Sequence, residues 1–269
     1  MATAMARGLA QNGIVGAEEM TACDVSAAAR SCFTEATGVS CAEAPGKAFT
    51  QADIVLLAVK PQMAEEAARA LPRLGPEVLI ISIAAGVPLA RLQDWFGTGR
   101  VLRVMPNTPL LVGQGATVYA RGSEARDADA ARCEQIFGGL GSVQEVPEGW
   151  INAVTALSVS GPAYVFEMVQ ALTDAGIAVG LPAELALGLT VQTLAGAAEM
   201  LRQELGSPDD LRRAVTSPGG TTAAGLAVLE AGGFRPLIRR TVQAAYNRAD
   251  ELGKVGDQSL PSGPTSASR

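Results

Sequence analysis

Two patterns of apolar residues divide the chain near residue 150. Before that point, short apolar runs alternate with segments of helical spacing. The runs DIVLLAV (53–59) and VLIISI (78–83) are apolar without alternation, which is typical of central strands buried on both faces. Strands that alternate with helices predict a parallel sheet with helices on both sides. The predicted strands are MTACDV, ADIVLLAV, EVLIISIAA, RVLRVM and GATVYA.

After residue 150 the β-type runs stop, and helical segments follow to about residue 253. Ser207 precedes Pro208 and two aspartates, a sequence that favours a helix start. The helical segments in the 160s and 180s are apolar almost all the way round, which is more than an isolated helical domain of this size can bury. A homodimer built from these helices, or a higher homo-oligomer, is therefore expected.

The start of the chain departs from the usual order of a dinucleotide-binding domain, which is a strand, a G-x-G-x-x-G or G-x-G-x-x-A turn and a helix. MATAMARGLAQNG resembles the helix alone, and Asp24, after the next strand, lies where an acid would contact the cofactor ribose. In the order 3-2-1-4-5-6 the first strand is central, so its loss would leave backbone groups unpaired. We therefore expect a Rossmann-like, doubly wound parallel sheet whose first strand is missing. Either the true start lies upstream of Met1, or the chain is a natural fragment with impaired cofactor binding.

Composition narrows the possible chemistry. The 27 acidic residues outnumber the 21 basic ones, which are scattered, so neither a nucleic acid nor a membrane surface is an expected partner. The apolar runs are shorter than the roughly 18 to 20 residues that span a bilayer, and no signal peptide is evident, so a cytoplasmic location is expected. The chain has no histidine, and its four cysteines follow no metal-binding spacing, so we expect no metal. Chemistry must then depend on a cofactor, hydroxyls, backbone groups or carboxylates.

The segment VTSPGGTTAAG (215–225) is a candidate anion site. Two glycines leave the backbone open, and the following apolar run predicts a helix that ends at the next glycine pair. The unpaired amides and positive dipole end of a helix start would favour a carboxylate or phosphate. An ordinary helix cap after a turn explains the same residues equally well.

Several segments together resemble one family, pyrroline-5-carboxylate reductase, from Met1 to about Gly253. In chain order they are AVKPQ (58–62), MPNTP (105–109), SGPAYVF (160–166), DAGIAVGLP (174–182) and VTSPGGTTAAGLAVLEAGGF (215–234). The resemblance implies reduction of 1-pyrroline-5-carboxylate to L-proline with NADPH or NADH, the last step of proline biosynthesis. It also implies a dinucleotide-binding domain over 1–149, a helical substrate and dimerisation domain over 150–253, and a tail over 254–269 whose polar composition predicts disorder.

The resemblance assigns roles to individual residues. The substrate carboxylate would bind the turn at 217–222, with Thr222 as the catalytic residue that hydrogen-bonds the imine nitrogen. The implied substrate-binding residues are Val215, Ser217, Gly219, Gly220, Thr221 and Thr222. The implied cofactor-binding residues are Asp24, Ala58, Val59, Lys60, Pro61, Met105, Asn107, Ser160, Gly161 and Pro162. Without the resemblance, a solvated lysine, a rigid turn and a helix break would account for the last nine.

Three questions stay open at this level. Asp24 favours NADH, whereas Ser26 and Arg30 nearby could accommodate the 2′-phosphate of NADPH, which the family resemblance favours. A β-hydroxyacid dehydrogenase has a similar two-domain pattern, but commonly uses a lysine on a helix of the second domain, and the only lysines here are 47, 60 and 254. A non-catalytic dimeric paralogue that has lost dinucleotide binding is the third alternative.

Overall fold

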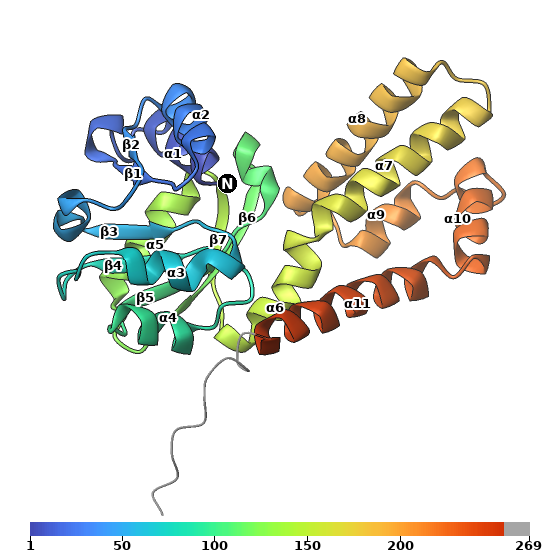
Figure 1. The fold of residues 1–269 in the computed structure, drawn as a ribbon. Helices are drawn as coiled ribbons and strands as arrows, with labels where there is room; N and C mark the ends of the chain where they lie inside the picture. Colours follow the sequence, from blue (N-terminus) through green and yellow to red (C-terminus); the bar gives the residue numbers. More distant parts are fainter. Residues whose placement is uncertain (256–269) are drawn as a thin grey trace, which may run out of the picture. The chain divides into compact units, whose positions relative to one another are not determined.

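The computed structural model in Figure 1 describes residues 1–255. Its contacts divide the chain into two compact units. Among the described residues, the first unit, here the sheet unit, comprises Met1–Ser160 and 245–255, and the second, the helical unit, is Gly161–Ala244. Lys254 and Val255, at the start of the predicted tail, belong to a helix, and the rest of that tail lies outside the described residues.

The sheet unit contains a five-stranded sheet in the order β3-β4-β5-β6-β7. Its strands are β3 (Ile54–Leu57), β4 (Leu79–Ser82), β5 (Val101–Met105), β6 (Gly115–Arg121) and β7 (Gly141–Glu145). The first three are parallel, as the strand and helix pattern predicted, whereas β6 runs antiparallel to β5. The connection from β5 to β6, residues 106–114, is shorter than the dozen or so residues that a parallel crossover needs. Sequence analysis did not predict β7, whose residues are polar and partly exposed.

Helices cover both faces of this sheet. One face packs against α3 (Ala64–Ala70), α4 (Leu89–Phe96) and α6 (Ile151–Val154), and the other packs against α1 (Ala2–Gln11) and α5 (Asp127–Gly138). Figure 1 shows α3 and α4 in front of the strands and α5 behind them. All residues of β4 and β5 are buried, as their unbroken apolar runs indicated.

The first strands of the chain form a separate sheet. It contains only β1 (Ala22–Cys23) and β2 (Cys41–Ala42), which are parallel and flank α2 (Ala27–Thr37). Within the described residues, β1 pairs only with β2, and β3 pairs only with β4. The break between the two sheets therefore lies where the order 3-2-1-4-5-6 places the first strand.

A buried ion pair ties the start of β5 to α5. Arg100 Nη2 and Nε donate to the two carboxylate oxygens of Asp129 at 2.7 and 3.0 Å, and the Asp129 side chain is fully buried. The carboxylate also accepts the backbone N–H of Arg126 at 2.9 Å. Burial acts to raise the pKa of Asp129, but the hydrogen bonds from Arg100 and Arg126 outweigh it and hold the pKa below its usual value.

The helical unit is made of α-helices joined by short turns. They are α7 (Gly161–Ala178), α8 (Ala183–Arg202), α9 (Pro208–Ala214), α10 (Thr221–Ala231) and the part of α11 (Phe234–Val255) that precedes Ala245. Ser207 caps α9 as predicted, since its hydroxyl accepts the N–H of Asp210. Helices α7 and α8 pack against each other, and Gly176 on α7 allows a close approach to Ala186 on α8.

The search for membrane spans found none. No helix within residues 1–255 combines the length and the apolar character that crossing a bilayer requires.

Candidate functional site

The ends of β3 and β5 bring two predicted cofactor segments to the same edge of the sheet. Both strands are parallel to β4, so residues 58–61 and 105–107 follow carboxyl ends that lie on one side. In open α/β sheets this is the edge where ligands bind. Ala58 and Val59 are half-buried, Lys60 and Pro61 are exposed, and Met105 lies in the core.

The side chain of Asn107 connects this edge to the segment that leads into α7. Its Nδ2 donates to the carbonyl and the hydroxyl of Ser158, at 3.2 and 3.3 Å, and its Oδ1 accepts the N–H of Ala116 at 2.8 Å. The structure thus places Asn107 beside the chain two residues before Ser160. Sequence analysis missed Ser158 and Ala116, because nothing in their residue types marks them as partners of Asn107.

Residues 155–159, just before Ser160, form a π-helix, in which the N–H of Ser160 bonds the carbonyl of Thr155. Such turns often occur at functional sites. Val159 packs against the core on the α3 and α4 side of the sheet. Gly161 and Pro162 form the start of α7, in the helical unit.

The turn between β1 and α2 holds the third predicted cofactor element. The Asp24 carboxylate accepts the N–H of Ser26 at 2.8 Å, and the Ser26 hydroxyl caps α2 by accepting the N–H of Ala29. Arg30 Nη1 donates to the carbonyls of Asp24 and Val25, at 2.9 and 3.1 Å. The side chain of Asp24 is exposed at the end of β1, which fits a ribose contact. Within this turn the backbone N–H of Ser26 and Arg30 Nη1 are engaged, and Arg30 Nη2 lies 3.9 Å from the Glu43 carboxylate, outside the turn.

The predicted substrate turn lies in the helical unit, between α9 and α10. Gly219 has a φ of +69°, a conformation that other residues adopt only with strain, so this position requires glycine. The N–H of Gly220 bonds the carbonyl of Ser217 at 3.1 Å, and a Cβ at Gly220 would overlap the Ser217 hydroxyl. Thr222 is half-buried, whereas Val215 and Thr221 are exposed.

The start of α10 has the electrostatics of an anion site. Gly220 is the N-cap residue and provides no side-chain cap, and the first turn carries no acidic residue. A helix start of this kind leaves several backbone N–H groups without an intrahelical acceptor and has a positive dipole end. The turn can therefore receive a carboxylate without displacing a side chain of its own.

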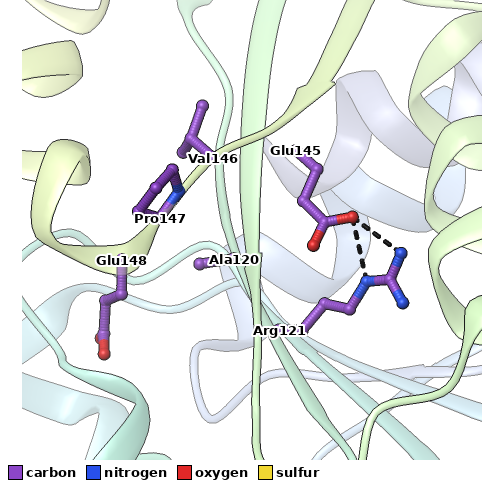
Figure 2. A pocket seen from close by; sticks show the side chains of 6 residues that line it. All are labelled: Ala120, Arg121, Glu145, Val146, Pro147 and Glu148. Carbon is purple, nitrogen blue, oxygen red and sulfur yellow. Dashed lines mark hydrogen bonds and ion pairs between the residues drawn. The ribbon is translucent and has the colours of Figure 1, made fainter.

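Figure 2 shows a pocket of the sheet unit at the carboxyl ends of β6 and β7. Its volume is about 410 Å³. It is lined by Ala120, Arg121, Glu145, Val146, Pro147 and Glu148. Because β6 runs antiparallel to β5, the carboxyl ends of β6 and β7 lie at the edge opposite to the ends of β3 and β5. In this pocket Arg121 is already paired with Glu145 at 2.7 Å, so it offers no free charge to a ligand.

The four cysteines are free thiols that differ in burial, from the exposed Cys32 to the buried Cys133. Cys133 is fully buried among core side chains, and burial raises the pKa of its thiol to about 12. Burial also raises the pKa of Cys23 and Cys41. Within residues 1–255 no group of three or more potential metal ligands comes together.

Two family models match this chain, one in its N-terminal part and one in its C-terminal part. Residues 148–252 match the family model for pyrroline-5-carboxylate reductase dimerisation, and residues 1–86 match the model for coenzyme F420-dependent NADP oxidoreductases. Pyrroline-5-carboxylate reductase from Glycine max is 42% identical over 254 residues, covering 94% of this chain and 92% of that protein. The enzyme of that name from Pseudomonas aeruginosa is 42% identical over 261 residues, with 94% of each chain covered.

Solved structures agree with these matches. The Coxiella burnetii pyrroline-5-carboxylate reductase structure superimposes with a TM-score of 0.83 at 35% identity, over 93% of this chain and 94% of that one. The Plasmodium falciparum pyrroline carboxylate reductase, solved with NADP bound, gives a TM-score of 0.84 at 31% identity, over 93% of both chains. The fold and these matches define a dinucleotide-dependent oxidoreductase with a helical second domain. More particularly, the chain belongs to the pyrroline-5-carboxylate reductase family.

Proposed function

We propose that this chain reduces 1-pyrroline-5-carboxylate to L-proline with NADPH or NADH, the final step of proline biosynthesis. The observation that carries the proposal is the uncapped start of α10 behind the turn at 217–220, in a chain whose relatives are named for this reaction. The family membership also argues against a β-hydroxyacid dehydrogenase, and the relatives, which are named as reductases, give no support to a non-catalytic paralogue.

The substrate carboxylate binds the amides at the start of α10. Gly219 and Gly220 keep side chains away from these amides, and Ser217 adds a hydroxyl at the same turn. The helix dipole favours a negative group there. Val215 and Thr221 limit where the pyrroline ring of the substrate can lie.

Thr222 orients the reacting imine. Its hydroxyl hydrogen-bonds the imine nitrogen and holds the ring with its C=N bond in one orientation, which is mainly a positioning contribution. A cyclic imine that binds in the protonated form needs no acid from the protein, since hydride addition to the ring carbon completes a neutral secondary amine. The dinucleotide supplies that hydride when bound. Catalysis can therefore proceed in a chain without histidine.

The cofactor residues belong mainly to the sheet unit. The segments at 58–61 and 105–107 line the dinucleotide at the carboxyl edge of the sheet, and Ser160, Gly161 and Pro162 complete its nicotinamide end. Asp24 contacts the ribose of the adenosine half. The exposed positions of Asp24, Lys60 and Pro61 support this assignment.

The domain assignment follows from these roles. Residues 1–149 form the dinucleotide-binding domain, and residues 150–253 form the substrate and dimerisation domain of a homodimer. The apolar residues exposed on α7, α8 and α10 support association with a second copy. We also propose a cytoplasmic location, since proline biosynthesis uses soluble metabolites.

The decisive experiment is the rate of NADPH oxidation in the presence of pyrroline-5-carboxylate, with proline quantified as the product. We expect oxidation that depends on substrate and forms one proline for each NADPH consumed. A folded dimer that binds NADPH in a fluorescence titration but forms no proline would overturn the proposed activity. A folded dimer that binds neither NADPH nor NADH would instead support the paralogue that has lost dinucleotide binding.

A further inference from the structure

The carbonyl of Ser158 lacks the donor that a continuous helix would give it. In an α-helix this carbonyl would accept the N–H of residue 162, four positions later. Residue 162 is proline, which has no N–H. The π-helix at 155–159 ends at this point, and α7 begins at Gly161. Pro162 therefore removes the α-helical donor of the Ser158 carbonyl, in a half-buried residue at the junction of two helices.

Asn107 supplies the missing donor from another part of the chain. Its Nδ2 reaches the carbonyl of Ser158 at 3.2 Å, and the Ser158 hydroxyl at 3.3 Å. The other end of the same amide accepts the N–H of Ala116, the second residue of β6, at 2.8 Å. Asn107 is 93% buried, so water competes little for these hydrogen bonds.

We propose that Asn107 is a positioning residue, whose amide replaces the helix hydrogen bond that Pro162 cannot make. It fastens the π-helix at 155–159 to the edge of the sheet where β5 ends and β6 begins. The backbone of Ser160 is thereby held in one conformation beside the cofactor segment at 105–107. This role rests on the proposed function, because Ser160 is assigned to the nicotinamide end of the cofactor.

Pro162 and Asn107 lie in separate segments but have complementary hydrogen-bonding properties. A proline at 162 creates the need for an external donor, and an asparagine at 107 meets that need while also pairing with β6. Aspartate at 107 has nearly the same shape and keeps the acceptor for the N–H of Ala116. It cannot donate to the Ser158 carbonyl when ionised, and its charge repels that oxygen.

The test is a double-mutant cycle with Asn107→Asp and Pro162→Ala, read out as the dissociation constant of NADPH by fluorescence titration. We expect Asn107→Asp to weaken NADPH binding by about 10- to 100-fold, the range for a buried carbonyl left without its donor. Pro162→Ala returns an N–H to position 162, so the double variant should recover most of this loss. NADPH binding that Asn107→Asp leaves unchanged, or a double variant with no recovery, would overturn the proposal.

Urea unfolding separates this role from a general loss of stability, and from failure of the proposed function. The matched control is Asn12→Asp, since Asn12 Nδ2 also donates to two backbone carbonyls, those of Gly8 and Gly139. We expect both aspartate variants to unfold at lower urea, but only the variant at 107 to be rescued by Pro162→Ala. Equal rescue of both variants would refute the specific pairing. If Asn107→Asp does not fold, recovery of folding by Pro162→Ala gives the same answer without cofactor or turnover.

Discussion

The sheet unit and the helical unit bury their apolar side chains in different ways. In the sheet unit, large residues such as Tyr119, Phe137 and Ile80 are fully buried within the described chain. In the helical unit only Thr173 and Ala186 are buried among the described residues, while many large apolar side chains are exposed. Those on α7 and α8 include Val165, Phe166, Leu172, Ile177, Leu185, Leu187, Leu189 and Val191.

The difference indicates where the stability of each unit originates. The sheet unit forms two internal cores, one on each face of its sheet, so its stability is a property of one chain. The helical unit leaves more apolar surface than a monomer keeps in water, and its sequence matches a dimerisation family. Its stability should therefore depend on protein concentration.

The largest expected effect is weaker association of two copies through the helical unit. Leu189 is half exposed and lines a hollow on α8 with Pro182, Leu185 and Gly188. Leu189→Asp removes an apolar contact from both copies of a symmetric dimer, which should weaken association by about 3 to 6 kcal/mol. Sedimentation at several concentrations measures the dimer dissociation constant. The control is Met63→Asp, an equal charge change on the sheet unit, which should leave the dimer dissociation constant unchanged. The same constant for Leu189→Asp and wild type would contradict the idea that the helical unit depends on association.

The next effect tests the internal stability of the sheet unit. Asp129→Ala leaves the buried Arg100 with only the exposed Glu77 carboxylate as a charged partner and should lower the free energy of unfolding by about 3 kcal/mol, independently of protein concentration. The control is Asp127→Ala on the same helix, which removes a fully exposed partner of Arg121 and should change the free energy of unfolding far less than Asp129→Ala does.

The same pair predicts a pH dependence. The folded-state pKa of Asp129 lies below its unfolded value, so its contribution to stability is present above about pH 4 and is lost as the pH falls through the folded pKa. The stability difference between wild type and Asp129→Ala should therefore shrink in acid. A difference that stays constant down to the acid transition would contradict the lowered pKa. Urea unfolding of wild type and Asp129→Ala over a pH series measures this stability difference.

The comparison extends to ligands, because the two units are assigned different reactants. Thr222→Ala in the helical unit should lower kcat/KM for pyrroline-5-carboxylate by the equivalent of about 1 to 3 kcal/mol, since the imine nitrogen loses a hydrogen-bond partner. The dissociation constant of NADPH should not change. Thr222→Ser, which keeps the hydroxyl, should retain most of the activity. Wild-type turnover in Thr222→Ala would remove Thr222 from its assigned role.

The smallest effect concerns cofactor choice in the sheet unit. Asp24 is exposed, and its charge repels a 2′-phosphate by about 1 kcal/mol at this solvent exposure. Asp24→Ser also frees the N–H of Ser26, so it should improve NADPH binding relative to NADH by about fivefold. Fluorescence titration with both cofactors measures the ratio. Glu35→Gln, an exposed acid on α2, serves as the control, and an equal shift in both variants would point to net charge alone.

Local patterns in the sequence determined much of the sheet unit. The apolar runs at 53–59 and 78–83 predicted β3 and β4 because a strand buried on both faces has no polar alternation. The change of pattern near residue 150 separated sheet from helices, and the Ser207 cap was evident from residue types at fixed spacing. The glycines at 219 and 220 likewise indicated a turn with an open backbone before α10.

Only the tertiary structure decided the partners of Asn107 and the engagement of Arg30 within its own turn. Each depends on residues that are distant in sequence or on a choice between equivalent acceptors, and neither leaves a periodic signal. For Asn107 the sequence held one indication, because the N–H that Pro162 lacks requires a donor from elsewhere. The sequence alone does not reveal which side chain supplies that donor. Residue type fixes what a group can donate or accept, whereas the fold decides which partner lies within reach.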